Sequence, residues 1–295
     1  MANFTNRQFD NYIAEEIEKY SGIAMPLKAG LLNRMLIRKE TCTKLHPNPE
    51  DEFSIPSVGP SYRIISEYEQ KFIRNIRTNQ DYFKGEEPII VEKMHPDGYM
   101  ILNGHHRWAA ALMLGYSKIP IQIVNVTHKT DIKEILRNSK HNRRVTFDLD
   151  EVIFCDDLQK AEKALTFPFD KFYKERLRLG VPALFRALEK CGYDVWLYSA
   201  KYYSIDYIKA LFKKYHVDIT GIVTGTGKKN NKEDRKAIEE LISARYLYTL
   251  HIDNDMVVNI NTSTKEFDEY EISDASTWSK DVIEIIREIN RDEEP

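Results

Sequence analysis

A hydrophobic stretch in the middle of the chain ends in two carboxylates. The segment RVTFDLDEVIF, residues 143–153, begins with the β-branched and aromatic residues of a buried strand, and Asp148 and Asp150 follow with one leucine between them. Because side chains along a strand alternate between its two faces, we expect both aspartates on the same face. Two carboxylates so placed repel each other, so the pair predicts either a cation site or a solvated strand end.

Other candidate catalytic residues follow strand-like segments later in the chain. Ser199 lies near the end of YDVWLYSA, and Asp253 and Asp255 lie at the end of LYTLHIDND. Between these segments, GTGKKNNKEDRKA places Lys229 and Lys232 near the start of a predicted helix. Carboxylates, a hydroxyl and an ammonium group at one edge of a sheet suit a phosphate ester and a hard cation such as Mg²⁺.

These residues need a sheet that brings the strand ends together. From residue 143 onward, strand and helix patterns alternate, which is typical of a parallel sheet with helices on both faces. In such folds the site lies beyond the carboxyl ends of the strands. The segment 156–182 is too short for a large helical cap domain, so we expect a small or absent cap over an open site.

The motifs in this order resemble those of the haloacid dehalogenase-like (HAD) phosphohydrolase superfamily. They are Asp-x-Asp after a strand, Ser after the next strand, Lys at a helix start and an acidic pair after a later strand. The resemblance covers residues 143–295 and implies a Rossmann-like fold and phosphomonoester hydrolysis through an aspartyl-phosphate. It implies that Asp148 is the nucleophile, that Asp150 is the general acid and base, and that Ser199 binds the phosphoryl group.

The same resemblance implies a Mg²⁺ site and a cation that offsets phosphate charge. The implied metal ligands are Asp148, Asp150, Asp253 and Asp255. The cation is Lys229 or Lys232; Lys228 lies close to both, so the spacing does not fix the lysine, although Lys229 is the best placed ahead of the predicted helix. This chain departs from the family in having Glu151 where glycine is common, and in having an asparagine inside the acidic pair. In the alternative interpretation, the aspartates only cap helices and end strands in water.

The first half of the chain contains a strand followed by a glycine turn and a helix. MILNGHHRWAAALMLGY places Asn103 and Gly104 in the turn, and His105, His106 and Arg107 at the helix start. Backbone N–H groups at a helix start attract anions, glycine permits close approach, and arginine can grip a phosphate with two hydrogen bonds. The alternative is a structural turn with both histidines on the surface.

The wider stretch, residues 43–127, resembles the ParB/sulfiredoxin-like superfamily. The resemblance rests on HPNPEDEF, a helix, the PIIV strand, a hairpin, the Gly-His-His-Arg turn and IPIQIV. It implies that the turn and its arginine bind a nucleotide, with ATP, ADP or CTP as candidates. His105 stands where the sulfiredoxin branch needs cysteine, which argues against sulfiredoxin chemistry. The branch that phosphorylates free serine has a similar turn and an acidic activating residue, for which Glu52 is our candidate.

Composition and charge narrow the class of protein. The 295 residues are 42% hydrophobic and 30% charged, with no apolar run near the ~20 residues of a membrane helix. Residues 1–140 carry 19 Lys and Arg against 17 Asp and Glu, and residues 141–295 carry 24 against 29, so charge does not favour nucleic acid as the main partner. Three scattered cysteines and no secretory signal predict a cytoplasmic protein without a membrane partner.

We therefore expect a two-domain α/β enzyme. Its segments are a helical extension (1–42), a ParB/sulfiredoxin-like α+β nucleotide-binding domain (43–128), a linker helix (129–142) and a HAD-like phosphohydrolase domain (143–295). Helical spacing predicts helix over much of residues 8–40, and PIIVEKMHPDGYMILNG predicts a β-hairpin.

The combination predicts a Mg²⁺-dependent phosphohydrolase fused to a nucleotide-binding or kinase domain, with a phosphorylated small molecule or a nucleic-acid end as substrate. A bifunctional kinase and phosphatase is one form of this hypothesis. The alternative is a nucleotide-responsive regulator that binds nucleic acid and whose second domain is not catalytic.

Overall fold

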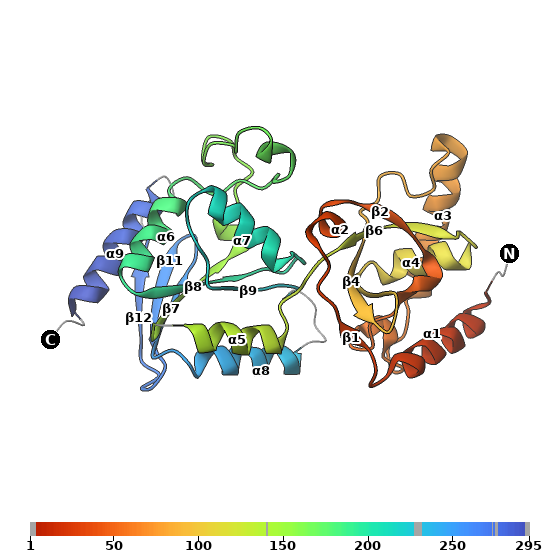
Figure 1. Cartoon of the computed structure of the whole chain (residues 1–295), viewed down its shortest axis with the longest axis horizontal. Coiled ribbons are helices and arrows are strands. Elements are labelled where there is room, and N and C mark those ends of the chain that lie inside the picture. The colour runs from red at the N-terminus through yellow and green to blue at the C-terminus, as the bar shows by residue number, and fades with distance from the viewer. Residues whose placement is uncertain (1–3, 140, 227–231, 273, 275–276, 293–295) are drawn as a thin grey trace. The chain divides into compact units, whose positions relative to one another are not determined.

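The computed structural model describes residues 4–139, 141–226, 232–272, 274 and 277–292. The chain divides between Asn125 and Val126 into two compact units, each with its own sheet and hydrophobic core (Figure 1). Within the described residues no helix is both long and apolar enough to cross a membrane.

The first unit has a mixed sheet with the strand order β2-β6-β4-β5-β3, and β1 pairs with β4. The expected hairpin is present as β4 and β5, which pair antiparallel, whereas β4 and β6 pair parallel. The elements of this unit are α1 (Asn6–Tyr20), β1 (Met25–Pro26), α2 (Leu31–Met35), β2 (Arg38–Thr41), β3 (Leu45–His46), α3 (Tyr62–Asn79), β4 (Ile89–His95), β5 (Tyr99–Asn103), α4 (His105–Met113) and β6 (Lys118–Ile123).

The first 42 residues are an integral part of this unit. Phe9 and Ile13 of α1 are buried in the same core cluster as Trp108 of α4. The expected second helix is short, because α2 ends at Met35 and the chain then pairs with β6 as β2. The helical spacing toward residue 40 is thus overridden by strand pairing.

The second unit has a sheet with the strand order β12-β11-β10-β7-β8-β9. The four strands from β10 to β9 are parallel, as expected, but β11 and β12 pair antiparallel, so the sheet is mixed. The elements of this unit are α5 (Lys129–Asn138), β7 (Arg143–Asp148), α6 (Val181–Lys190), β8 (Tyr193–Tyr198), α7 (Ile205–Lys214), β9 (Gly221–Val223), α8 (Lys232–Ser243), β10 (Tyr248–Ile252), β11 (Met256–Asn261), β12 (Phe267–Glu271) and α9 (Trp278–Asp292).

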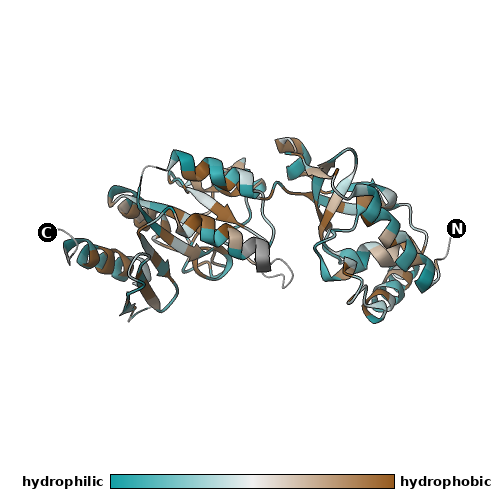
Figure 2. Cartoon of the chain, turned by 90° about the horizontal axis from the view of Figure 1, so that it is seen from below, coloured by the Kyte–Doolittle hydropathy of each residue, from teal (hydrophilic) through white to brown (hydrophobic). Residues whose placement is uncertain are grey.

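Helices cover both faces of this sheet, and the alternation along β8 shows which helices lie on which face. Val195 and Leu197 belong to a cluster that contains buried residues of α6, α7 and α9. Trp196, between them, belongs to a second cluster with Ile132 of α5 and Ile242 of α8. Figure 2 shows the corresponding hydrophobic and hydrophilic bands along the helices.

Helix α5 does not behave as the linker expected over residues 129–142. Ile132 and Leu136 are buried against the second sheet beside Trp196. The boundary between the units therefore lies at residues 125–126, before this helix, and not near residue 142.

A loop that we call the flap, residues 154–178, occupies the place of the expected small cap. Its base is closed by a bridge between Phe154 and Leu177, and a second bridge joins Ala161 to Arg178. Within it, Phe169–Lys171 form a single 3-10 turn. The flap is the green loop above α7 in Figure 1.

Candidate functional site

Three neighbouring parallel strands of the second unit end at the candidate active site. Asp148 is the last residue of β7, Ser199 directly follows β8, and Asp253 directly follows β10. The register pairs Asp148 with Tyr198, and it pairs the residue before Asp148 with the residue before Asp253. The structure therefore brings Asp148, Ser199 and Asp253 to one edge of the sheet.

The strand does not continue through both aspartates of the first motif. Residues Leu149–Ile153 form one turn of π-helix, and Asp148 Oδ1 caps it by accepting hydrogen bonds from the N–H groups of Asp150 and Glu151, both at 2.8 Å. The expectation that strand alternation puts Asp148 and Asp150 on the same face therefore does not apply, because Asp150 lies in the helical turn and not in the strand. The helix-cap interpretation does apply to one oxygen of Asp148, and this cap holds the carboxylate in place.

Asp150 lies at the centre of a cluster of polar side chains. Its Oδ2 accepts a hydrogen bond from the Ser199 hydroxyl at 2.5 Å, and its Oδ1 accepts one from the Tyr203 hydroxyl at 2.9 Å. Lys201 Nζ lies 3.4 Å from the same Oδ1. Ser199 is fully buried, and its Oγ accepts the N–H of Lys201 at 3.0 Å. Two hydroxyls and an ammonium group thus fix the orientation of Asp150.

Tyr203 and Lys201 were not among the residues expected from the sequence. Both lie in SAKYYS directly after β8, and their position past a strand end was the available signal. Burial, and secondarily the nearby carboxylate of Asp150, raise the pKa of Tyr203 above its ordinary value. The Tyr203 hydroxyl therefore keeps the proton that it donates to Asp150.

The acidic segment after β10 is a tight turn into β11. Asp253 and Asp255 have exposed side chains. Asn254, which the sequence interpretation treated only as a spacer, accepts a hydrogen bond from Arg178 at 2.7 Å and donates one to the carbonyl oxygen of Glu151 at 3.3 Å. Asn254 thus ties the turn both to the base of the flap and to the π-helical turn.

The four aspartates expected as metal ligands are not grouped as one site. In the described part of the chain, no three His, Cys, Asp or Glu side chains are arranged to hold a metal ion. Asp150 is directed at Ser199 and Tyr203 instead. Asp148 and Asp253 remain at neighbouring strand ends, and one or two carboxylates completed by water and substrate phosphate are typical of Mg²⁺ sites, so this pair fits that ion.

The expected lysine is placed only in part. Lys229 lies outside the described residues, and α8 begins at Lys232, whose side chain also lies outside them. In the described residues, Lys201 is a cation that contacts Asp150.

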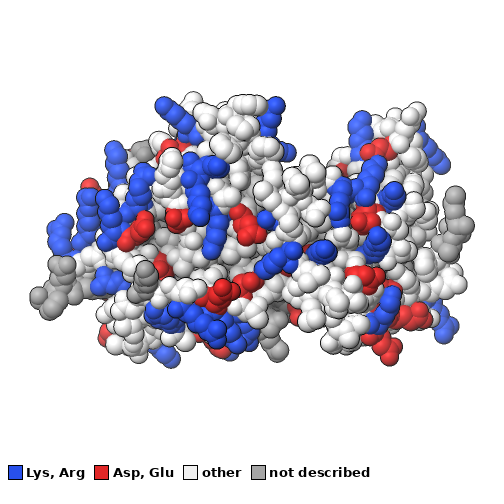
Figure 3. All heavy atoms as spheres, viewed as in Figure 1, with Lys and Arg blue, Asp and Glu red and all other residues white. Residues whose placement is uncertain are grey.

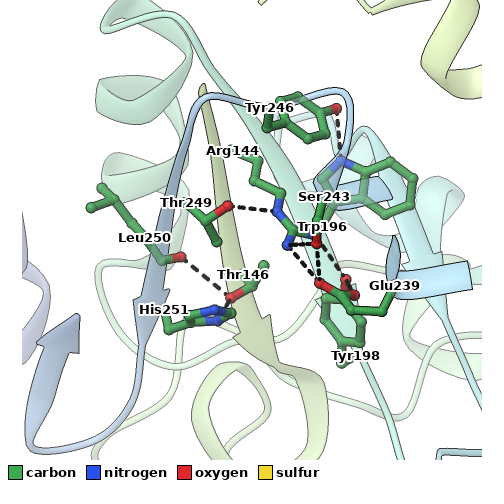
Figure 4. A network of polar contacts seen from close by, with 10 residues as sticks. All are labelled: Arg144, Thr146, Trp196, Tyr198, Glu239, Ser243, Tyr246, Thr249, Leu250 and His251. Atoms are coloured by element: carbon green, nitrogen blue, oxygen red, sulfur yellow. Dashed lines mark hydrogen bonds and ion pairs between the residues drawn. The ribbon is translucent and has the colours of Figure 1, made fainter. Parts of the chain in front are cut away.

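A buried polar network behind the site links three strands to α8 (Figure 4). Arg144 of β7 is 2% exposed, and its guanidinium contacts Glu239 at 2.5 Å, Thr249 at 2.9 Å and Ser243 at 3.0 Å. The hydroxyl of Tyr198 donates to the other oxygen of Glu239 at 2.8 Å. Charge-assisted hydrogen bonds of this kind hold β7, β8 and β10 in register beneath their carboxyl ends.

In the first unit, the Gly-His-His-Arg turn has a backbone that favours glycine. Gly104 has φ +102°, and it directly precedes α4. A Cβ at this position would lie 2.8 Å from Ile89 Cδ1 and 3.1 Å from Arg107 Nη2. Asn103, before it, ends β5 and pairs with Ile90. Both the backbone conformation and the close contacts therefore favour glycine at position 104.

Both histidines of the turn hold the preceding acidic loop. His105 is 3% exposed; its Nε2 accepts the N–H of Asn48 at 3.2 Å and its Nδ1 lies 3.5 Å from Asp51 Oδ2. His106 Nε2 accepts the N–H of Ser61 at 3.2 Å. The interpretation of the histidines as surface residues is therefore wrong for His105, which is an anchor for residues 48–61.

Arg107 and Glu52, the other two candidate residues of this region, differ in exposure. Arg107 is 7% exposed and donates to the carbonyl oxygen of Glu87. Glu52 begins a 3-10 turn, Glu52–Ser54, and is exposed, whereas its neighbour Asp51 faces His105. The acidic loop and the glycine turn thus form one structural feature at the start of α4.

Comparison with known proteins supports a ParB-like segment in the chain. Residues 70–140 match the family model of the ParB N-terminal domain. A segment of 39 residues is 51% identical to an ATP-dependent L-serine kinase of Desulfurococcus mucosus. That segment is 13% of this chain and only 15% of the kinase, so the chain spans a small part of that relative.

Two solved structures show weaker likeness. The C-terminally truncated chromosome-partitioning protein ParB from Caulobacter crescentus, complexed to the centromeric parS site, has 20% identity over 35% of this chain and 50% of its own, with a TM-score of 0.23. The C-terminal domain of the coenzyme A biosynthesis bifunctional protein CoaBC has 11% identity over 53% of this chain and 100% of its own, with a TM-score of 0.19.

Proposed function

We propose that the second unit is a Mg²⁺-dependent phosphohydrolase of the HAD type. The observation that carries the proposal is the convergence of Asp148, Asp150 and Ser199 at the ends of adjacent parallel strands, with Ser199 Oγ 2.5 Å from Asp150 Oδ2. A nucleophile, a proton-transfer group and a phosphate-binding hydroxyl are the parts that phosphoryl transfer to a carboxylate needs.

The chemistry proceeds in two displacements. In the first, Asp148 Oδ2 attacks phosphorus, the bond to the ester oxygen breaks, and Asp150 gives its proton to the departing oxygen. In the second, Asp150 takes a proton from water, whose oxygen attacks phosphorus, and the bond to Asp148 breaks to release inorganic phosphate. In both steps the Ser199 hydroxyl would turn from Asp150 to a phosphoryl oxygen, and Lys201 would bind the phosphoryl oxygens as well. Mg²⁺ held by Asp148 and Asp253 would offset the negative charge of the phosphoryl group.

A phosphate-release assay tests this proposal directly. The intact chain is mixed with sugar phosphates, nucleotides, phosphoserine and phosphorylated oligonucleotides, with Mg²⁺ or with a chelator. We expect release that requires Mg²⁺ and that falls at least about 1,000-fold in Asp148→Asn. Asp268→Asn, an exposed position on β12, is the matched control and should retain activity. Release that persists in Asp148→Asn, or in the chelator, contradicts the proposal.

A second activity is proposed for the first unit, namely binding of ATP, ADP or CTP at Gly104 and Arg107. It is supported by the local identity with an ATP-dependent L-serine kinase and by the acidic loop held against the glycine turn. If Glu52 activates a hydroxyl there, the chain transfers phosphate from nucleotide to an acceptor such as serine. We expect Glu52→Gln to abolish transfer while leaving nucleotide binding intact, and Arg107→Ala to weaken that binding.

The ParB match also favours a regulator that binds nucleic acid. Salt-dependent binding to duplex DNA, together with no phosphate release from any ester in Mg²⁺, would replace the enzyme proposal by this alternative.

A further inference from the structure

The flap of the second unit exposes aromatic rings to solvent. Phe167, Phe172 and Phe169 lie within six residues, and they are 73%, 47% and 36% exposed. Aromatic residues dominate cores and interfaces because they bury large apolar areas, so three exposed phenylalanines in one short loop indicate a surface that meets a ligand.

Lysines lie against these rings. Lys171 Nζ is 5.2 Å from the centre of the Phe167 ring, and Lys214 Nζ of α7 is 3.7 Å from the centre of the Phe169 ring. The whole flap carries six Lys and Arg against five Asp and Glu, and the positive excess lies in residues 171–178, which carry four Lys and Arg against one Glu. Figure 3 shows Lys and Arg side chains around the flap and over α7. The surface therefore combines ring faces with positive charge.

The flap is connected to the candidate active site at both of its ends. Phe154, at its start, packs edge-on against Tyr203, with ring centres 5.9 Å apart, and Tyr203 donates to Asp150. Arg178, at its end, donates to Asn254 beside Asp253. Both ends of the flap therefore contact residues that directly neighbour the carboxylates of the candidate active site.

The body of the flap is fixed along α7. Tyr207 packs against Tyr173 with ring centres 5.2 Å apart, and its hydroxyl contacts Glu175. The hydroxyl of Tyr215, at the end of α7, donates to the carbonyl oxygen of Lys163 at 3.3 Å. The rings of Phe167 and Phe172 are therefore presented to solvent on a supported loop.

We propose that the flap binds an unpaired nucleobase next to the phosphate that the second unit hydrolyses. Every base has a π-face that stacks on an aromatic ring, and lysines beside the ring hold neighbouring phosphates, which is the combination used in single-strand recognition. The substrate class is a phosphate ester on a nucleotide or at the end of a single-stranded nucleic acid. This inference rests on the phosphohydrolase proposed above.

The test compares four esters in the intact chain. They are a terminally phosphorylated single-stranded octanucleotide, the same end in a blunt duplex, a nucleoside monophosphate and glycerol phosphate. We expect Phe167→Ala/Phe172→Ala to lower kcat/KM for the single strand by about tenfold or more, as for loss of base stacking, and to leave glycerol phosphate unchanged. A similar loss for the monophosphate identifies a nucleotide as sufficient; a loss for the octanucleotide alone identifies the strand.

The control is Phe267→Ala on β12, a phenylalanine of the same unit that is 61% exposed and lies outside the flap. It should change none of the four rates. An equal loss for all four esters, or no loss for the single strand in a protein that hydrolyses glycerol phosphate, overturns the flap assignment and leaves the phosphohydrolase standing. No release from any ester by the unaltered chain overturns the phosphohydrolase itself, and the flap assignment with it.

Discussion

Asp150 shows, at the scale of single residues, how an active-site carboxylate can be held by groups far from it in sequence. The hydroxyls of Ser199 and Tyr203 and the ammonium of Lys201 all reach it from the segment after β8. Donors on one side of a carboxylate fix which oxygen is presented on the other, so Tyr203 is a positioning residue for the proposed proton transfer.

Replacement of Tyr203 tests that role. Tyr203→Phe removes one hydrogen bond to Asp150, and we expect kcat to fall about tenfold with little change in KM. Because burial and Asp150 raise the pKa of Tyr203, its hydroxyl stays protonated through the alkaline range, so the alkaline limb of the pH–rate profile should be the same in both proteins. An alkaline limb that disappears in Tyr203→Phe contradicts this assignment.

A second prediction separates the two acidic residues after β10. Asp253 follows the strand beside β7, whereas Asp255 lies on the far side of the turn, before β11. Asp253→Asn should raise the Mg²⁺ concentration for half-maximal activity by at least about tenfold, because it removes one of two charged ligands. Asp255→Asn should raise it far less, and equal effects from the two variants would show that both bind the ion.

The spacing of residues in the sequence predicted which residues lie at the strand ends, but it did not predict which other side chains contact them there. Asp148, Ser199 and Asp253 were identifiable because each lies at the end of a hydrophobic strand or directly after it. Lys201 and Asn254 were not, because their contacts depend on how a turn and a loop fold back onto the sheet edge. The position of Asp150 was also not predictable from strand alternation, because the strand ends at Asp148 and a π-helical turn follows.

At the scale of elements, the Arg144 network explains why the strands of the site stay aligned. It joins β7 to β10 through Thr249 and to α8 through Glu239 and Ser243. Burial alone would raise the pKa of Glu239, but its hydrogen bonds with Arg144 outweigh burial, and the net shift is downward. The pair is therefore ionised under ordinary conditions.

Arg144→Met is expected to destabilise the second unit. It leaves Thr249 and Ser243 without their charged donor and Glu239 without its counter-ion. The Glu239 side chain is 43% exposed and can be partly hydrated, so the loss should be at the lower end for a broken buried pair, about 3 kcal/mol. Urea unfolding measures it, with the exposed Arg287→Met as control. A loss no greater than that of the control would show that the network contributes nothing.

Elements with a strong hydrophobic period were predictable, and those set by pairing partners were not. α1, α3, the β4–β5 hairpin and the four parallel strands follow the sequence pattern. β2 was expected as helix because its pairing with β6 depends on residues about 80 positions away, a separation that local periodicity does not encode. The sequence analysis also did not predict β11, which pairs antiparallel with the preceding strand β10 across the turn that contains Asp253 and Asp255.

At the scale of the whole molecule, the chain is two folding units whose boundary precedes α5. The family match to residues 70–140 crosses that boundary, although Ile132 and Leu136 are buried in the core of the second unit. Because α5 packs in the core of the second unit, a stable fragment of that unit should include this helix.

A fragment that begins at residue 126 should be more stable than one that begins at residue 143. The shorter fragment loses two buried aliphatic side chains, Ile132 and Leu136, and exposes the ring of Trp196. Each such side chain stabilises a fold by roughly 1.5–3 kcal/mol, so we expect a difference of about 3–6 kcal/mol in the free energy of unfolding. Equal thermal midpoints for the two fragments would show that α5 is dispensable.

The helix cap formed by Asp148 suggests a way to identify the substrate with an inactive variant. One oxygen of this side chain receives the backbone hydrogens of the π-helical turn, and an asparagine oxygen can receive the same two hydrogens. Asp148→Asn should thus keep the shape of the pocket edge while being unable to form the acyl phosphate. The Asp148→Asn variant, incubated with a cell extract, should therefore retain its bound substrate ester, and mass spectrometry would give the mass of that ester.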